Sequence, residues 1–290
     1  MKNKFFFIAI LFAGVISIDS IAQKQEFKIS LAEWSLHRTL GKGTITNLDF
    51  PRIAKTTYDL DAVEYVSVYF KGKAEDIEYL TNLKNECTKY GVKSLIIMVD
   101  GEGNLADTSL ATRTKAIENH YKWIKAAQFL GCHSIRVNAA GRGSMEQRQA
   151  AAIDALSKLS DYAAQFGINV IVENHGGFSS NGIWLSEIMK KVNKPNCGTL
   201  PDLGNFYEYD RYQGVTDLMP FAKGVSGKTY DFDADGNETK IDYAKMMKII
   251  SDAKYSGYID VEYEGTKLSE DEGIKASIAL LKKVIAPYNK

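Results

Sequence analysis

The sequence contains few cysteines and few histidines, and neither sign of charge is in excess. Its three cysteines, Cys87, Cys132 and Cys197, are widely spaced, and there are four histidines. An odd number of cysteines at this spacing predicts neither a disulfide framework nor a CxxC metal site, so we expect buried free thiols. Lysine plus arginine equals aspartate plus glutamate, at 36 each. This balance argues against nucleic acid as a partner.

Long apolar runs are also absent, apart from one at the N-terminus. Lys2 and Lys4 precede the apolar residues 5–18, and the small residues Ser20 and Ala22 follow before Gln23. This order is typical of a secretory signal peptide, and a run of about 14 residues is short for a membrane span. We therefore expect a signal peptide over 1–22, a domain over 23–290, and a periplasmic protein without membrane contact after cleavage. A retained N-terminal anchor is the alternative.

Short apolar segments alternate with longer amphipathic ones along the rest of the chain. The segments that we expect to be strands are 27–34, 62–68, 92–99, 134–138, 168–173, 197–202, 224–229 and 258–263. Apolar residues at helical spacing predict helices over 76–90, 112–130, 145–166, 241–254 and 270–285. Alternation of this kind predicts parallel strands joined by right-handed crossovers. Eight such units fit an α/β fold, a single (β/α)₈ or TIM barrel.

A doubly wound open sheet is the alternative architecture. Such a sheet usually carries a glycine-rich phosphate-binding turn after its first strand. Here residues 31–43 read LAEWSLHRTLGKG and contain no such turn. We therefore expect a closed barrel and no nucleotide.

Polar side chains follow most of the predicted strands, at the ends that surround one mouth of a barrel. Residues 170–177 read VIVENHGG, for example, so a buried strand runs directly into a carboxylate. A ring of such groups suits a small polar substrate, with tryptophan as an apolar platform. The residues at these ends are Glu33, Trp34, His37, Glu64, Arg136, Asn138, Glu173, His175, Asp202, Asn205, Lys228, Glu262 and Glu264. Of these we expect substrate contacts from Trp34, His37, Glu64, Asn138, His175 and Asn205.

Several of these residues also have structural interpretations. Glu173 could bond a neighbouring strand, and Asp202 could cap the turn that follows Pro201. Glu262 and Glu264 alternate along one strand and face the same side, with Glu262 as the inner residue. Residues 231–242 read DFDADGNETKID and imitate a calcium-binding loop, but the twelfth residue is Asp instead of Glu and no helix precedes the segment. We expect an ordinary turn there.

Four segments together resemble a known family. VIVENHGG, TLPDLGNF, GVSGKTYDFD and GYIDVEYEG resemble the last four strands of the sugar phosphate isomerase/epimerase superfamily, the xylose isomerase-like TIM barrels. The resemblance covers nearly all of the mature chain. It implies a divalent metal bound by a Glu, an Asp, a His and a Glu from successive strands, with the two Glu residues often serving as acid and base. The matching residues here are Glu173, Asp202 and Glu262.

The seventh strand departs from the family pattern, because Ser226 stands where the resemblance implies histidine. A hydroxyl oxygen suits Mn, Co or Zn less well than an imidazole nitrogen. His175 or Asn205 could substitute, or Lys228 could place a cation where the metal would lie. The sequence therefore leaves two alternatives: a divalent metal (Mn, Mg, Co or Zn) and a lysine ammonium that stabilises an enolate.

The resemblance implies an isomerase or epimerase acting on a free sugar or keto-sugar. Glu173 and Glu262 would move the proton alpha to a carbonyl, with the metal or Lys228 opposite the enolate oxygen. Export favours an unphosphorylated carbohydrate as the partner. A lyase or dehydratase acting on a keto-sugar and a non-catalytic carbohydrate-binding barrel are the alternatives. An endonuclease, known in the wider superfamily, is disfavoured by four histidines and zero net charge.

Overall fold

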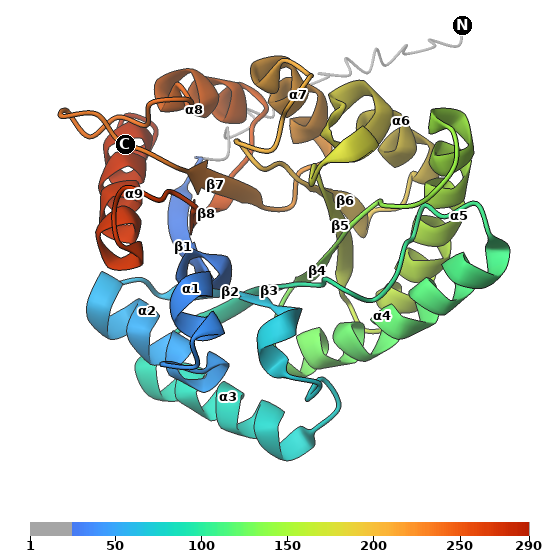
Figure 1. Ribbon diagram of the computed structural model, residues 1–290, viewed down its shortest axis with the longest axis horizontal. Coiled ribbons are helices and arrows are strands. Elements are labelled where there is room, and N and C mark those ends of the chain that lie inside the picture. The colour runs from blue at the N-terminus through green and yellow to red at the C-terminus, as the bar shows by residue number, and fades with distance from the viewer. Residues whose placement is uncertain (1–24, 290) are drawn as a thin grey trace, which may run out of the picture.

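Eight parallel strands form an inner ring with helices around it (Figure 1). The structure is a computed structural model that describes residues 25–289. The strands are β1 (Phe27–Ala32), β2 (Ala62–Val66), β3 (Lys93–Met98), β4 (Ser134–Val137), β5 (Asn169–Glu173), β6 (Cys197–Leu200), β7 (Val225–Thr229) and β8 (Gly257–Tyr263). The α-helices are α1 (His37–Gly41), α2 (Phe50–Tyr58), α3 (Ile77–Tyr90), α4 (Leu110–Leu130), α5 (Met145–Ala164), α6 (Gly182–Val192), α7 (Arg211–Leu218), α8 (Tyr243–Asp252) and α9 (Glu270–Ile285).

The ring of strands closes on itself. Each strand pairs in parallel with its neighbour from β6 back to β1, and β1 pairs with β8, which pairs with β7. Between β6 and β7 the contact consists of two isolated parallel bridges, Thr199 with Ala222 and Asp202 with Ser226. Pro201 has no N–H for a ladder, but its carbonyl accepts a hydrogen bond from Ser226 at 2.9 Å. The predicted barrel is therefore confirmed, and its loosest seam runs beside Asp202.

Helix ends follow ordinary capping chemistry. Ser144 and Ser269 begin α5 and α9 with reciprocal capping boxes. Gly91 and Gly131 end α3 and α4 at positive φ, which costs glycine little. All five predicted helices are present, whereas α1, α2, α6 and α7 were not predicted as helices. These four are short, with 5, 9, 11 and 8 residues, so their apolar pattern spans few turns.

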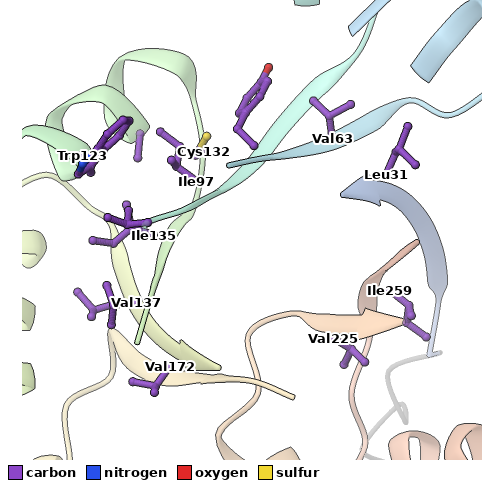
Figure 2. Packing of buried hydrophobic residues seen from close by; sticks show 14 of the residues in the cluster. Leu31, Val63, Ile97, Trp123, Cys132, Ile135, Val137, Val172, Val225 and Ile259 are labelled. Atoms are coloured by element: carbon purple, nitrogen blue, oxygen red, sulfur yellow. The ribbon is translucent and has the colours of Figure 1, made fainter. Parts of the chain in front are cut away.

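Alternate strand residues build two different layers. Apolar side chains that face the helices form the main core, shown in Figure 2: Leu31, Val63, Ile97, Ile135, Val137, Val172, Val225 and Ile259, with Trp123 and Cys132 among them. A smaller apolar cluster fills part of the barrel interior: Ala32, Ala62, Val66, Leu95, Ile96, Met98, Ile171 and Leu200. Most of the cluster's side chains come from β2 and β3, whereas β7 and β8 present polar groups inward. The interior is thus apolar on one side and ionisable on the other.

Further predictions concern the cysteines, membrane-spanning helices and the signal peptide. The three cysteines are all free; Cys87 and Cys132 are buried as expected, whereas Cys197 is only half-buried. None of the helices in the described part of the chain is both long and apolar enough to cross a membrane. The predicted signal peptide, residues 1–22, lies outside the described residues.

Candidate active site

Three buried carboxylates from three strands meet inside the barrel. Glu173 is the last residue of β5, Asp202 follows β6 by two residues, and Glu262 lies near the end of β8. One oxygen from each lies within 4.8 Å of the other two. All three side chains are buried. Acids that are far apart in the sequence therefore converge at one point, as the strand-end pattern predicted.

The backbone after β6 fixes the orientation of Asp202. Its Oδ1 accepts hydrogen bonds from the N–H groups of Gly204 at 2.6 Å and Asn205 at 2.8 Å. The Asn174 side chain holds the Asp202 backbone, accepting from its N–H at 2.8 Å and donating to its carbonyl at 2.9 Å. Asn174, which lies between Glu173 and His175, therefore has a structural role. The second oxygen of Asp202 is left facing the barrel interior.

Lys228 provides the cation on this side of the site. Its Nζ lies 2.7 Å from Glu262 Oε1, 3.3 Å from Asp202 Oδ2 and 3.3 Å from Glu264 Oε2. Burial alone would lower the pKa of Lys228, but the charges of Asp202 and Glu262 raise it well above its usual value. Burial likewise opposes ionisation of Glu262, yet Lys228 and a 2.7 Å hydrogen bond from Ser226 lower the pKa of that carboxyl. Both groups are therefore charged.

Glu173 has different partners. Its Oε1 accepts a hydrogen bond from Asn205 Nδ2 at 3.1 Å. Arg136 Nε lies 2.8 Å from its Oε2, but the N–H is not directed at that oxygen, so the contact is ionic and not a directed hydrogen bond. The same guanidinium donates to Asp100 Oδ1 at 2.7 Å. Arg136 therefore links Glu173 to a further carboxylate.

Asp100 was not among the predicted site residues. It follows β3 by two residues, so the strand-end pattern that identified the other acids would also have identified it. Its Oδ1 accepts from both Arg136 and Asn138, each at 2.7 Å. Burial favours the neutral acid, but Arg136 outweighs it and lowers the pKa of Asp100. Asn138, a predicted substrate contact, is thus partly engaged by this carboxylate.

Two other predicted substrate contacts form one platform after β1. The rings of Trp34 and His37 stack with centroids 5.0 Å apart. Trp34 Nε1 donates to Glu264 Oε1 at 2.5 Å, and Glu264 in turn faces Lys228. The platform is thus connected to the carboxylate cluster. The roles of Trp34 and His37 in binding remain predictions.

The remaining predicted contacts lie in different surroundings. Asn205 reaches Glu173 directly, whereas His175 is exposed. Glu64 is buried inside the barrel, where it accepts a 2.8 Å hydrogen bond from Ser30 beside Asp260. Burial raises the pKa of Glu64 to about 7 and that of Asp260 well above its usual value. Glu64 thus belongs to an internal acid pair, and its contact with substrate remains a prediction.

The donor set at the three carboxylates fits an oxygen-preferring divalent ion. Glu173, Asp202 and Glu262 offer carboxylate oxygens, and Ser226 adds a hydroxyl 3.5 Å from Asp202 Oδ2. Burial, reinforced by the charges of Glu262 and Glu173, raises the pKa of Asp202 to about 8 although Lys228 opposes the shift. One ammonium therefore does not balance these acids. Hard oxygen ligands of this kind suit Mg²⁺ or Mn²⁺.

The calcium-like segment forms a turn, as expected. Asp233 Oδ1 accepts from the N–H groups of Asp235 and Asn237, both at 2.9 Å. Asp231 pairs with Lys267 at 3.0 Å, and Phe232 bridges Glu238 in antiparallel fashion. Both carboxylate oxygens of Asp233 therefore accept hydrogen bonds within the turn.

Comparisons with known proteins agree with this architecture. The family model described as xylose isomerase-like TIM barrel matches residues 52–284. A 59-residue segment is 32% identical to the 3'-dehydrocarminate deglycosidase alpha subunit of a Microbacterium species and covers 20% of this chain and 17% of that protein.

Solved structures extend the likeness over the whole barrel. The zinc-bound IOLI protein superposes with a TM-score of 0.73 at 17% identity, covering 90% of this chain and 99% of that one. The 3-keto-D-glucoside 4-epimerase YcjR from E. coli, in its apo form, gives a TM-score of 0.70 at 15% identity, covering 89% and 100%. The chain belongs to the xylose isomerase-like TIM barrel family.

Proposed function

We propose that this chain is an isomerase or epimerase of an unphosphorylated keto-sugar, working by proton transfer at a carbon next to a carbonyl. The observation that carries the proposal is the pair Glu173 and Glu262: two buried carboxylates that meet beside Asp202 but have different partners. Carboxylates in different environments are the usual way in which one site obtains an acid and a base. The names of the protein relatives, an epimerase of a keto-glucoside and a deglycosidase of a dehydro-sugar conjugate, point to the same substrate chemistry.

Glu262 is the stronger candidate for the base that starts the reaction. Lys228 lowers the pKa of this carboxyl, so it is ionised and ready to accept a proton. The C–H bond alpha to the carbonyl would break, its proton would pass to Glu262, and its electron pair would form the enolate. Glu173, on the other side of the cluster, would first take up a proton from solvent; it would then return that proton to the opposite face or to the adjacent carbon and be left as the carboxylate beside Arg136. The first outcome is epimerisation and the second is isomerisation.

The Lys228 ammonium is paired with carboxylates and so is less available to contact the substrate. An ammonium has three N–H donors, and three carboxylate oxygens lie within 3.3 Å of Nζ. We therefore assign Lys228 to keeping Glu262 ionised. A divalent ion held by Glu173, Asp202 and Glu262 would supply the Lewis acid for the developing oxyanion. The predicted role of Lys228 as the direct enolate partner thus becomes the secondary hypothesis.

Charge also favours a neutral substrate. The two buried cations of the described site, Arg136 and Lys228, both face carboxylates. A phosphate group would have to displace one of those carboxylates and leave it buried without a partner, which is costly. Keto-sugars without phosphate meet no such penalty.

The proposal is tested by incubating the purified protein with a panel of keto-sugars in deuterated buffer, with and without Mn²⁺ or Mg²⁺. We expect solvent deuterium at the carbon next to the carbonyl, together with an epimer or isomer detected by NMR. An unsaturated product would indicate a lyase instead, since the enolate that the same base forms can expel a leaving group from the β-carbon. Binding of sugar without deuterium exchange across the panel would contradict the proposal and leave a carbohydrate-binding barrel.

A further inference from the structure

A cavity of about 430 Å³ lies near the carboxylate cluster, on the same face of the barrel. Its walls come from three successive βα connections. The start of α5 contributes Met145, the connection after β5 contributes residues 177, 178, 180 and 181, and the connection after β6 contributes residues 207–209. In a TIM barrel these connections all lie at the catalytic face. The helices that they lead into, α5, α6 and α7, follow one another around the ring (Figure 1).

This cavity is connected to the carboxylate cluster through Asn205. The Asn205 side chain donates to Glu173 at 3.1 Å, and its backbone carbonyl accepts from Ser180 Oγ, a cavity residue, at 2.6 Å. Tyr207, two residues further on, stands against the glycine pair that follows His175: a Cβ placed on Gly176 would lie 3.9 Å from Cε2 of Tyr207. A molecule with one ring at Glu173 could therefore place a second ring in the cavity.

The lining is aromatic and polar, with little positive charge available. Tyr207 is 73% exposed, which is high for so large an aromatic side chain, and Phe178 also lines the cavity. The Arg148 guanidinium lies 4.5 Å from the Phe178 ring centroid, so one face of that ring is already engaged. Glu208, an exposed carboxylate, would repel an anionic ligand. Aromatic faces pack against the C–H faces of a neutral ring, and a carboxylate accepts hydrogen bonds from its hydroxyls.

We propose that this cavity is a subsite for the second, non-reacting sugar ring of a neutral glycoside, so that the substrate is a keto-glycoside and not a free monosaccharide. This inference rests on the proposed function, because that function places the reacting ring at Glu173 and Glu262. Binding energy from a remote part of a substrate can be used to hold the reacting part in place. The cavity volume lies within the range of small-molecule sites.

The test compares the binding of unoxidised sugars, which removes any dependence on turnover. Glucose, cellobiose, laminaribiose and gentiobiose are titrated into the protein by calorimetry or ligand-observed NMR. We expect at least one disaccharide to bind about tenfold more tightly than glucose, the size expected for one well-packed ring on an aromatic side chain. Equal affinities for glucose and all three disaccharides would overturn the proposal.

Two variants locate the effect in the cavity. Tyr207→Ala removes the exposed aromatic, and Met145→Trp fills the space from the first residue of α5, a position that is 39% exposed. Both should lower the disaccharide-to-glucose affinity ratio toward one. Leu110→Trp, at the exposed first residue of α4, is the matched control and should keep the ratio. A ratio unchanged in both cavity variants would also overturn the proposal.

The outcome can be separated from that of the proposed function. Deuterium exchange into a keto-sugar with no disaccharide preference would keep the function and remove the subsite. A disaccharide preference that depends on Tyr207, without any exchange, would keep the subsite and remove the catalytic proposal.

Discussion

The two sides of the barrel mouth balance their charges differently. On the β3–β5 side, the planar guanidinium of Arg136 lies between Glu173 and Asp100, and the pKa of Asp100 falls as a result. On the β6–β8 side, the single ammonium of Lys228 faces three carboxylates, and the pKa of Asp202 rises to about 8, chiefly through burial. The first side has two carboxylates for one cation, and Asp100 is part-exposed. The second side has three carboxylates for one cation, a larger surplus of negative charge that another cation would relieve.

This difference suggests distinct tasks for the two sides. An arginine fork is rigid and always charged, so it holds Glu173 and Asp100 in fixed positions. A lysine is a compact charge on a flexible stem, and its carboxylate partners can be rearranged when a divalent ion or a substrate arrives. We infer that the β3–β5 side holds the proposed acid Glu173 in a fixed position, whereas the β6–β8 side carries the proposed base Glu262 and adjusts to a bound ion or substrate. The following predictions test this contrast, from the largest expected effect to the smallest.

The largest effect should come from Glu173→Gln, which removes a proton carrier while keeping an acceptor for Asn205. We expect kcat on a keto-sugar substrate to fall by about 10²–10⁴-fold, the usual contribution of general acid–base catalysis. Steady-state kinetics measure it. Glu118→Gln, on the exposed face of α4, is the control. Unaltered kcat in Glu173→Gln would show that this carboxylate moves no proton.

Removing the ammonium of the β6–β8 side should destabilise the fold. Lys228→Met leaves Asp202 and Glu262 buried without their cation, and we expect the free energy of unfolding to fall by about 3–5 kcal/mol. Urea denaturation measures this change, with the exposed Lys248→Met as the control. Added Mn²⁺ should restore part of the loss, because a divalent ion can replace the missing charge. A variant as stable as wild type would contradict the charge surplus.

On the other side, Arg136→Met should cost somewhat less, about 2–4 kcal/mol, because the Asp100 side chain is 30% exposed and can be solvated. Arg136→Lys should recover only part of the stability, because a lysine ammonium lacks the planar guanidinium that contacts both Glu173 and Asp100. The comparison again uses urea denaturation at fixed pH. Equal stability of the lysine and arginine forms would show that geometry on this side is unimportant.

The smallest effect concerns Glu33, which is buried beside the mouth with one oxygen bound to the Val66 N–H at 2.8 Å. Burial raises its pKa to about 8, whereas the unfolded carboxyl titrates near 4.5. Between these two values the folded protein binds more protons than the unfolded one, so stability falls as pH rises. Glu33→Gln removes the contribution of this carboxyl to the pH dependence of stability. It should be about 1–3 kcal/mol more stable than wild type above pH ~8 and similar near pH ~4.

The pH dependence is measured by urea denaturation of the two proteins side by side across this range. The difference between variant and wild type isolates Glu33 from the buried Glu64 and Asp260, whose pKa values are also raised. A difference that does not change with pH would mean that Glu33 is ionised in the folded protein.

Much of this architecture could be predicted from periodicity and strand ends. All eight strands occur where short apolar segments placed them, and Glu173, Asp202 and Glu262 meet because parallel strands bring their ends to one face. Strand β6 ends earlier than predicted, at Leu200, because Pro201 cannot donate to a ladder. That change does not displace Asp202, whose bridge to Ser226 continues the pairing.

Other features depend on contacts that a single sequence does not specify. The link from Arg136 to both Glu173 and Asp100 joins three strands, and no local pattern encodes it. The same holds for the internal acid pair of Glu64 and Asp260, since burial and not residue type raises their pKa values. The ion pair between Lys228 and Glu264, 3.3 Å apart, likewise depends on where the residue that follows β8 places its carboxylate. The role of each of these charged residues therefore depends on where its partners lie in the fold, which its residue type alone does not specify.

The account depends most on the claim that Glu173, Asp202 and Glu262 act as one cation-binding set. Calorimetric titration of Mn²⁺ and Mg²⁺ into wild type, Glu173→Gln, Asp202→Asn and Glu262→Gln measures this directly. We predict one bound divalent ion in the wild-type protein and an affinity at least tenfold lower in each of the three variants, because each removes one shared carboxylate. Absence of binding to wild type, or full affinity in any one variant, would contradict it.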